Sequence, residues 1–298
     1  MLAVLLALAA AVGYGGSDYA AGLAARRASV VRVTVLSEAT SVVLLGCVVP
    51  FLGSRAPDLA SVLWAAGAGV SGVTGAMALY LGFRHAAFSV ASPVSAVGSA
   101  AFSVLAGLVL GERPGALSLA GICFALPAIV AVSAPAGNPR QHEAGPPGQH
   151  EAGPPGQHRH AAGVGLGLAA GAGFGLFFIG LNRAGSGSDL WPIVVSQVAA
   201  LVTVTGFAAA TRQLGLPQAG ARGLAMLTGS IGAAGTFAFF LATHRGLLAV
   251  TAVITSLYPA GTILLARALS GERLTALRII GLSLAAASVG LIAAGGAG

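Results

Sequence analysis

The sequence of 298 residues is 56% hydrophobic and only 8% charged, with 15 basic residues, all of them arginine, against 8 acidic ones. A soluble domain carries about 25% charged residues. This chain therefore cannot cover a water-facing surface, and lipid must be its main solvent. The net charge of +7 comes from arginines scattered between apolar stretches. That pattern is typical of topology signals and headgroup contacts, so the lipid bilayer is an expected partner and nucleic acid is not.

Ten apolar stretches are long enough to cross a bilayer as helices. In the first half of the chain they are about Leu2–Leu23, Ser29–Leu52, Leu59–Phe83, Ala86–Leu110 and Gly115–Ser133. In the second half they are about Ala162–Leu181, Leu190–Ala210, Ala221–Thr243, Gly246–Leu269 and Leu274–Ala294. Many carry Gly, Ala and Ser at four-residue spacing, which lets helix backbones approach closely in lipid. The predicted fold class is an all-α polytopic membrane protein with a tight bundle.

The chain repeats itself at an offset of 160 residues. Gly111-Glu112-Arg113 recurs as Gly271-Glu272-Arg273, and Gly121 falls on Gly281. We therefore divide the chain into residues 1–135 and 162–298, each a five-helix repeat. A duplicated apolar half is typical of membrane carriers, which place the substrate site between the halves, although a duplication can also be purely architectural. The first stretch resembles a signal peptide's apolar core without a basic leader, and its repeat match favours a retained span.

Residues 136–161 separate the two halves and have a different composition. They contain the eight-residue word Gln141–Gly148, which is repeated from Gln149 to Gly156. A Pro/Gly/His-rich stretch of this kind has almost nothing to bury, so we expect a disordered linker. Its histidines could bind a metal, but tandem low-complexity words often arise by slippage and the site would not be preformed. No metal site and no cofactor are expected.

A set of short motifs, in order, resembles a known family. Ala78–Arg84, then Ser89–Val94, then Leu110–Arg113 are similar to the EamA-type half of the drug/metabolite transporter superfamily, and the second half repeats the pattern more loosely. Tyr14-Gly15 stands where that family often has an aromatic–Gly pair. The resemblance implies ten helices as two five-helix repeats of opposite membrane orientation. It also implies a central cavity that opens alternately to each side, and export or exchange of a small metabolite or drug.

The two halves differ in their prolines. Pro93 falls on Val253 at the repeat offset, and the second-half proline is Pro259, six residues later. Because proline determines where a helix bends, the fourth and ninth helices should bend at different heights. The two gates that the resemblance implies need not be equivalent.

Glu38 is the most informative polar residue. It lies about nine residues into the second span, roughly 14 Å deep at ~1.5 Å per residue, where a charge costs on the order of 3 kcal/mol or more. Its counterpart in the second half is Gln197, because the segment before Glu38 aligns with the one before Gln197. Glu38 is either a carboxylate for proton coupling or for a substrate amine, or half of an interhelical hydrogen bond that orders the bundle.

Other candidates for a solute cavity are aromatic and hydroxyl side chains in the spans. The set comprises Tyr14, Tyr80, Phe174 and Tyr258 as amphipathic walls, and Ser89, Ser92, Thr251 and Thr255 as hydroxyls. The resemblance implies that the fourth and ninth helices line the pathway. Each side chain could equally serve packing or a back-bond to the preceding helical turn. We interpret Asp18 as an interfacial ion pair with Arg26 or Arg27, and Glu112 and Glu272 as structural charges at helix ends.

The two indications of membrane orientation conflict. With a cytoplasmic N-terminus, the cytoplasmic loops would hold only four arginines, which are Arg55, Arg113, Arg183 and Arg245. The positive-inside rule therefore favours both termini outside, whereas the resemblance implies both termini inside. Several opposing arginines, such as Arg32, Arg267 and Arg278, fall within the expected helix ends, so we favour the family topology with both termini inside.

These observations predict a secondary-active transporter of the inner or plasma membrane that moves a small-molecule solute by alternating access. Glu38 is the candidate for proton coupling. No Walker-type phosphate loop is present, so ATP is not the direct driver. A membrane-embedded enzyme would need clustered His, Asp or Glu at membrane depth, and catalysis is not expected. The alternative is a non-transporting membrane scaffold or accessory subunit. A homo-oligomer is left open.

Overall fold

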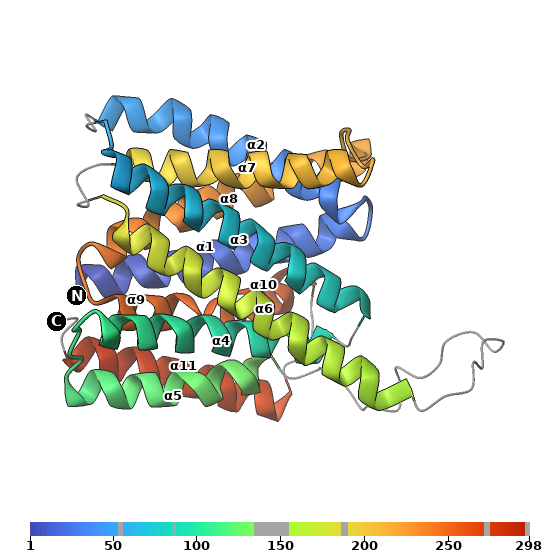
Figure 1. Ribbon diagram of the computed structural model, residues 1–298. Coiled ribbons are helices and arrows are strands. Elements are labelled where there is room, and N and C mark those ends of the chain that lie inside the picture. The colour runs from blue at the N-terminus through green and yellow to red at the C-terminus, as the bar shows by residue number, and fades with distance from the viewer. Residues whose placement is uncertain (53–55, 86–87, 134–154, 186–189, 271–274, 296–298) are drawn as a thin grey trace.

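A computed structural model of the protein describes residues 1–52, 56–85, 88–133, 155–185, 190–270 and 275–295, without the side chains of residues 80–93, 155–162, 266 and 270. Every regular element in the described residues is a helix (Figure 1). Eight are long and apolar enough to cross a membrane, and two shorter apolar helices, Val94–Val109 and Ala116–Val132, accompany them. The predicted class, an all-α polytopic membrane protein, is confirmed.

The helices follow the predicted spans closely. The first half holds α1 (Leu2–Ala25), α2 (Val30–Val48), the short 3₁₀ helix η1 (Val49–Leu52), α3 (Leu59–His85), α4 (Phe88–Val109) and α5 (Ala116–Val132). The second half holds α6 (Pro155–Arg183), α7 (Trp191–Ala210), α8 (Ala219–Thr243), α9 (Leu248–Thr255), α10 (Tyr258–Ser270) and α11 (Ala276–Gly295). The first residue of α1 and the last of α11 lie at the same end of the bundle (Figure 1).

The ninth span differs from the single helix predicted over Gly246–Leu269. It is broken into α9 and α10, and the break falls at Ser256 and Leu257. Pro259 follows in the first turn of α10. Because proline has no N–H, it cannot bond to the carbonyl four residues earlier, and it favours a helix start over a helix interior. The proline that the sequence singled out thus interrupts the helix.

Helix α6 also begins earlier than the predicted span. Its first residue is Pro155, which lies inside the segment 136–161 that the sequence assigned to a linker. Residues 134–154 fall outside the described part of the chain. Of the predicted linker 136–161, the structure therefore describes only residues 155–161.

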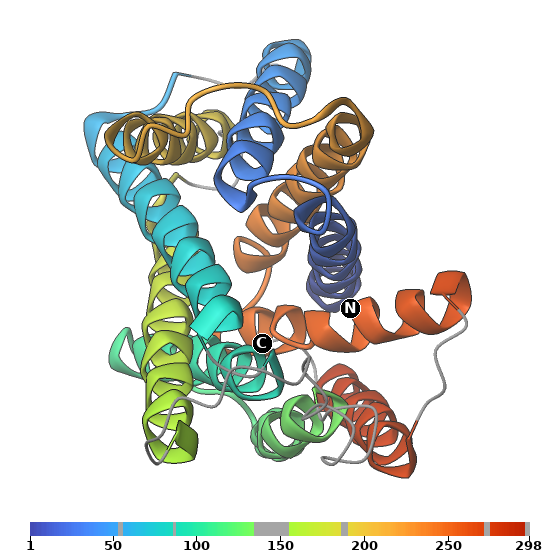
Figure 2. The ribbon, with the colours of Figure 1, turned by 90° about the vertical axis from the view of Figure 1, so that its right-hand side faces the viewer.

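Helices of one half pack chiefly on helices of the other half (Figures 1 and 2). At the repeat offset, helices α1, α2, α3, α4 and α5 correspond to α6, α7, α8, the α9–α10 pair and α11. The contact of α1 with α8 then corresponds to that of α6 with α3, and α2 with α8 corresponds to α7 with α3. Three contacts map onto themselves, namely α2 with α7, α4 with α9 and α5 with α11. Two inverted five-helix repeats would give this pattern.

One reciprocal contact can be followed at residue level between α5 and α11. A Cβ on Gly121 would lie 2.6 Å from Ile292 Cγ1, and a Cβ on Gly281 would lie 2.8 Å from Val132 Cγ2. Gly121 and Gly281 are repeat equivalents, and so are Val132 and Ile292. Each glycine therefore packs against an apolar side chain of the opposite helix, and the two contacts are repeat equivalents of one another. Small residues permit this close approach where lipid provides no hydrophobic force between helices.

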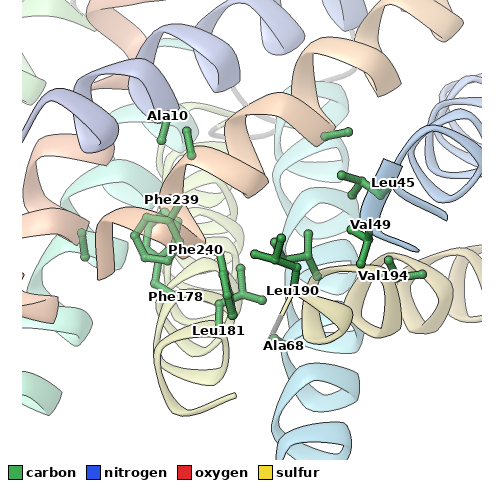
Figure 3. Close-up of a cluster of buried hydrophobic side chains, with 14 of the residues drawn as sticks. Ala10, Leu45, Val49, Ala68, Phe178, Leu181, Leu190, Val194, Phe239 and Phe240 are labelled. Carbon is green, nitrogen blue, oxygen red and sulfur yellow. The ribbon is translucent and has the colours of Figure 1, made fainter. Parts of the chain in front are cut away.

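The largest buried cluster joins residues of seven of the spans (Figure 3). Phe178 of α6 and Phe239 of α8 lie with their ring centroids 4.5 Å apart, and both are almost fully buried. Ala10 of α1 packs beside them, while Leu45 and Val194 bring in α2 and α7. This buried cluster packs together the helices that position the polar groups described next.

Candidate functional site

Glu38 and Gln197 meet across the contact between α2 and α7. The Gln197 Nε2 group donates a hydrogen bond of 3.2 Å to Glu38 Oε2. Gln197 is buried, with 7% of its surface exposed, and Glu38 is half-buried. The structure thus joins the two residues that the local alignment of the two halves paired. A hydrogen bond at this depth fits both interpretations of Glu38, the structural and the functional.

The choice of an amide as partner has a chemical consequence. An amide presents a donor on one side and an acceptor on the other. Gln197 can therefore donate to a carboxylate, and after rotation it can accept from a protonated carboxyl. An arginine in its place could only donate, and would hold Glu38 permanently ionised. The pair is suited to a carboxyl group that changes its protonation state.

Tyr14 of α1 forms a second polar contact close by. Its hydroxyl donates a hydrogen bond of 3.1 Å to Thr236 Oγ1 of α8, and α1 also contacts α2, the helix that carries Glu38. The Tyr14 ring lies 6.5 Å from Phe177 and 6.5 Å from Phe178, both on α6. We call Tyr14, Glu38, Gln197 and Thr236 the central polar group. It draws on α1, α2, α7 and α8, and so on both halves of the chain.

The other aromatic candidates do not all join this group. Tyr258, at the start of α10, is 7% exposed and lies in a hydrophobic cluster against which Tyr14 packs. Phe174 packs instead in a separate small cluster with Leu79 and Ala170. The side chains of Tyr80, Ser89 and Ser92 lie outside the described part of the structure. Among the aromatic candidates whose side chains are described, Tyr14 and Tyr258 are therefore brought together.

The two threonine candidates on α9 are enclosed by protein. Thr251 and Thr255 have no exposed surface. The Thr251 hydroxyl donates to Leu247 O at 3.0 Å within its own helix, and Thr255 Oγ1 lies 3.5 Å from Ala7 O of α1. In this conformation their hydroxyls serve helix packing, which is one of the roles that the sequence left open.

Asp18 has a different environment from the one expected. It is half-buried on α1, and no ion pair joins it to a cation among the described residues. Arg27, one of its two expected partners, donates instead to Gly220 O at 3.3 Å. The neighbouring Ser17 hydroxyl donates to Thr228 O of α8 at 3.0 Å. Asp18 therefore lacks the predicted charge partner among the described residues.

Several contacts could not be found from the repeat. Thr236 falls on Ala76 at the repeat offset, so symmetry gives it no emphasis. Ser99 of α4 and Ser256, at the break after α9, have their hydroxyl oxygens 3.1 Å apart, and both are fully buried. This contact depends on the break in the ninth span, which Pro259 signals only indirectly.

Glu112 has a more specific role than the one assigned from sequence. Its Oε1 accepts the Leu248 N–H at 2.6 Å and its Oε2 accepts the Ala249 N–H at 2.8 Å. These two amides open α9 and have no partner within the helix. Gly111, in the left-handed region with a φ of +90°, turns the chain so that Glu112 reaches them. The glycine in this motif therefore positions a carboxylate cap across 136 residues.

Comparison with known proteins agrees with this architecture. No curated protein matches the chain. The solved chain described as "Crystal structure of protein" matches with a TM-score of 0.72 at 15% sequence identity, over 98% of this chain and 98% of its own. At that identity the likeness shows the fold alone. The family model described as "EamA-like transporter family" matches residues 1–134. This match over residues 1–134 confirms the resemblance to the EamA-type half seen in the motifs.

Proposed function

We propose that this multi-pass membrane protein is a secondary-active transporter of the cell membrane, which exports or exchanges a small metabolite or drug-like solute. The EamA-like match over residues 1–134 supports a membrane transporter. The observation that carries the proposal further is the hydrogen bond between Glu38 and Gln197. It sets one ionisable group at membrane depth, at a contact between the two halves.

Glu38 would take up and release the coupling proton. Ionised, it accepts from Gln197; protonated, it can donate to the rotated amide, so Gln197 can pair with either form while α2 and α7 are in contact. A charge at this depth costs on the order of 3 kcal/mol or more unless water or a partner reaches it. The carboxyl is therefore expected to ionise when its side of the protein opens to water and to be neutral when that side closes. A substrate amine could replace the proton in the same position.

The helix contacts support alternating access between two bodies that mix the repeats. One body comprises α1, α2 and α8, and the other α3, α6 and α7, each held by extensive contacts. Figure 2 shows α3 and α6 on one side and α1 and α8 on the other. The bodies meet where α2 touches α7, and α4 touches α9 between them. We expect the Glu38–Gln197 and Ser99–Ser256 hydrogen bonds to form and break as the bodies rock.

The solute is expected to be neutral, zwitterionic or cationic. Glu38, Asp18, Tyr14 and the buried hydroxyls offer carboxylate and hydroxyl oxygens within the spans. The described arginines lie at the helix ends, so they could bind an anion there and not within the spans. A polyanion has no cationic partner at depth among the described residues.

The first experiment is a thermal-shift screen of the purified protein against amino acids, amines, nucleosides, sugars and cationic drugs. A solute that binds the folded state raises its apparent stability by mass action. A stabilising solute is then tested in proteoliposomes with an imposed pH gradient, with Glu38→Gln against the exposed control Asp58→Asn. We expect Glu38→Gln to lose gradient-driven uptake and the control to retain it. Full gradient-driven uptake by Glu38→Gln would refute the proton-coupling role.

The alternative, a non-transporting scaffold or accessory subunit, makes the opposite prediction. A scaffold would show no solute-dependent stabilisation and no flux, for the wild type and both variants alike. Solute exchange without a pH gradient separates the two parts of our proposal. Exchange that survives in Glu38→Gln would retain transport and remove only the coupling.

A further inference from the structure

The two ends of the bundle differ sharply in charge. Among the residues whose side chains are described, one end carries seven arginines, which are Arg26, Arg27, Arg32, Arg212, Arg222, Arg267 and Arg278. The other end carries three, Arg113, Arg183 and Arg245, together with the carboxylates Asp58 and Glu112. Both chain termini lie at the end with three arginines (Figure 1). Figure 2 faces the seven-arginine end, which we call the arginine end.

The connections at the arginine end are joined to one another. Arg32 Nε donates to Gln213 O at 3.2 Å, and the Ser29 hydroxyl donates to Gln213 Oε1 at 2.8 Å. Together with the Arg27 bond to Gly220 O, these contacts tie the α1–α2 connection to the α7–α8 connection. These contacts hold the Arg27 and Arg32 guanidinium groups against the neighbouring connection.

These hydrogen bonds leave most of the guanidinium donors available. A guanidinium has five N–H donors, and Arg27 and Arg32 each use one for a backbone carbonyl. Arg26 and Arg212 are exposed. None of these four is paired with a carboxylate among the described residues. Planar guanidinium groups with free donors match phosphate oxygens well, both in charge and in geometry.

We infer that the arginine end faces the cytoplasm, where its guanidinium groups contact the phosphates of anionic lipids, and that both chain termini face outward. The physical reason is that arginines in short connections resist transfer across the membrane and are drawn to the anionic inner leaflet. The arginines also stand on three separate connections around the bundle end, which a membrane surface can contact all at once. This inference rests on the proposed location in the cell membrane, and it holds for a carrier and for a scaffold alike.

The structure removes the main reason for favouring both termini inside. Arg32, Arg267 and Arg278 lie near helix ends, but each stands in the first or last turn of its helix, next to a connection at the arginine end. We therefore count all three among the positive charges of the arginine end. Among the arginines whose side chains are described, the asymmetry is seven against three, and it opposes the orientation with both termini inside.

Cysteine labelling tests the orientation directly. The native cysteines Cys47 and Cys123 are exposed and are first replaced by alanine. Gln218→Cys then marks the arginine end, and Gly115→Cys marks the other end, where an added Cβ meets nothing within 4 Å. With a membrane-impermeant maleimide, we expect Gly115→Cys to be labelled in intact cells and Gln218→Cys only after permeabilisation. The reverse pattern would overturn the inference and leave the transport proposal untouched.

A charge series tests the cause. Replacing Arg26, Arg27, Arg212 and Arg222 by Gln should give a mixed population in which both cysteine markers are labelled in intact cells. Replacing the same four by Lys should keep a single orientation, because Lys retains the charge. Replacing all three arginines of the opposite end by Gln should also keep it. A single, unchanged orientation in the four-residue Gln variant would refute the role of these charges.

Lipid contact has its own readout in purified protein. We expect phosphatidylglycerol to raise the apparent melting temperature more than phosphatidylcholine of the same chain length, and the four-residue Gln variant to lose most of this difference. Equal stabilisation of the wild type by the two lipids would overturn the contact with anionic headgroups.

Discussion

Gly13 of α1 and Gly235 of α8 approach so closely that a Cβ on Gly13 would lie 2.9 Å from Gly235 Cα. The same relationship recurs 160 residues away along both partners. A Cβ on Gly173 of α6 would lie 2.7 Å from Gly75 Cα of α3. In both pairs the obstacle is backbone, which cannot move aside as a flexible side chain does. These two contacts therefore limit how closely α1 can approach α8 and how closely α6 can approach α3.

Gly13→Ala is therefore expected to destabilise the protein. Overpacking of a tight contact costs about 1–3 kcal/mol, so the melting temperature in detergent should fall. Gly173→Ala should behave in the same way. Gly22→Ala is the matched control on α1, because its Cβ would meet nothing within 4 Å and alanine favours the helix by about 0.5–1 kcal/mol. Equal melting temperatures for Gly13→Ala and Gly22→Ala would contradict the close crossing.

Glu112→Ala should loosen the start of α9. It removes both acceptors of the Leu248 and Ala249 N–H groups, and losing such a cap costs about 0.5–2 kcal/mol. We expect a lower melting temperature and faster hydrogen exchange at these two amides. Arg113→Ala, at the exposed neighbouring position, should change stability by less than about 0.5 kcal/mol. Unchanged exchange in Glu112→Ala would show that the cap does not hold the helix in solution.

Tyr14→Phe separates packing from hydrogen bonding in the central polar group. The ring contacts with Phe177 and Phe178 remain, while the bond to Thr236 Oγ1 is lost. We expect a stability loss of about 0.5–1.5 kcal/mol, measured by thermal unfolding. If the hydroxyl faces the solute, the concentration of a stabilising solute needed for half its effect should rise several-fold. Tyr14→Ala, which also loses the ring, should lose considerably more stability.

Asp58 gives a prediction for pH. Its carboxylate accepts the Ser61 N–H at 2.8 Å just before α3 begins, and hydrogen bonding from Ser61 lowers the pKa of Asp58. A lowered pKa means that the carboxylate stabilises the fold above its ordinary pKa of about 3.9. That contribution disappears as the pH falls through the lowered value. Asp58→Ala should thus melt earlier than wild type near neutral pH and match it in strong acid. A difference independent of pH would assign the effect to something other than this charge.

The sequence predicted the spans because each is a long apolar run, and lipid allows few alternatives to a helix. It also aligned Glu38 with Gln197, and these two residues are in contact. The ninth span was predicted as one helix because its hydropathy is continuous, whereas the break depends on how Pro259 meets neighbouring helices. Contacts such as Tyr14 with Thr236 depend on how α1 lies against α8, and nothing within either segment specifies that register.

Glu112 shows what a repeat conceals. The motif around it occurs in both halves, and charged residues at helix ends usually serve as anchors, so the sequence favoured a structural charge. The carboxylate is indeed structural, but its partners are two amides at the start of another helix. Identifying them requires knowing that the α4–α5 connection and the start of α9 lie at the same end of the bundle. Sequence spacing alone does not give that information.

The reciprocal packing of the two halves also affects how the protein is made. Helix α1 finds its main partner, α8, only after 218 further residues have been synthesised, counted from Ala25 to Thr243. At about 5–20 residues per second this takes on the order of ten to forty seconds. During that time the small-residue faces of the first helices have only lipid or the insertion machinery as neighbours. An insertase or chaperone that shields them should matter more for this protein than for one whose halves fold separately, and the two halves expressed as separate chains should accumulate only together.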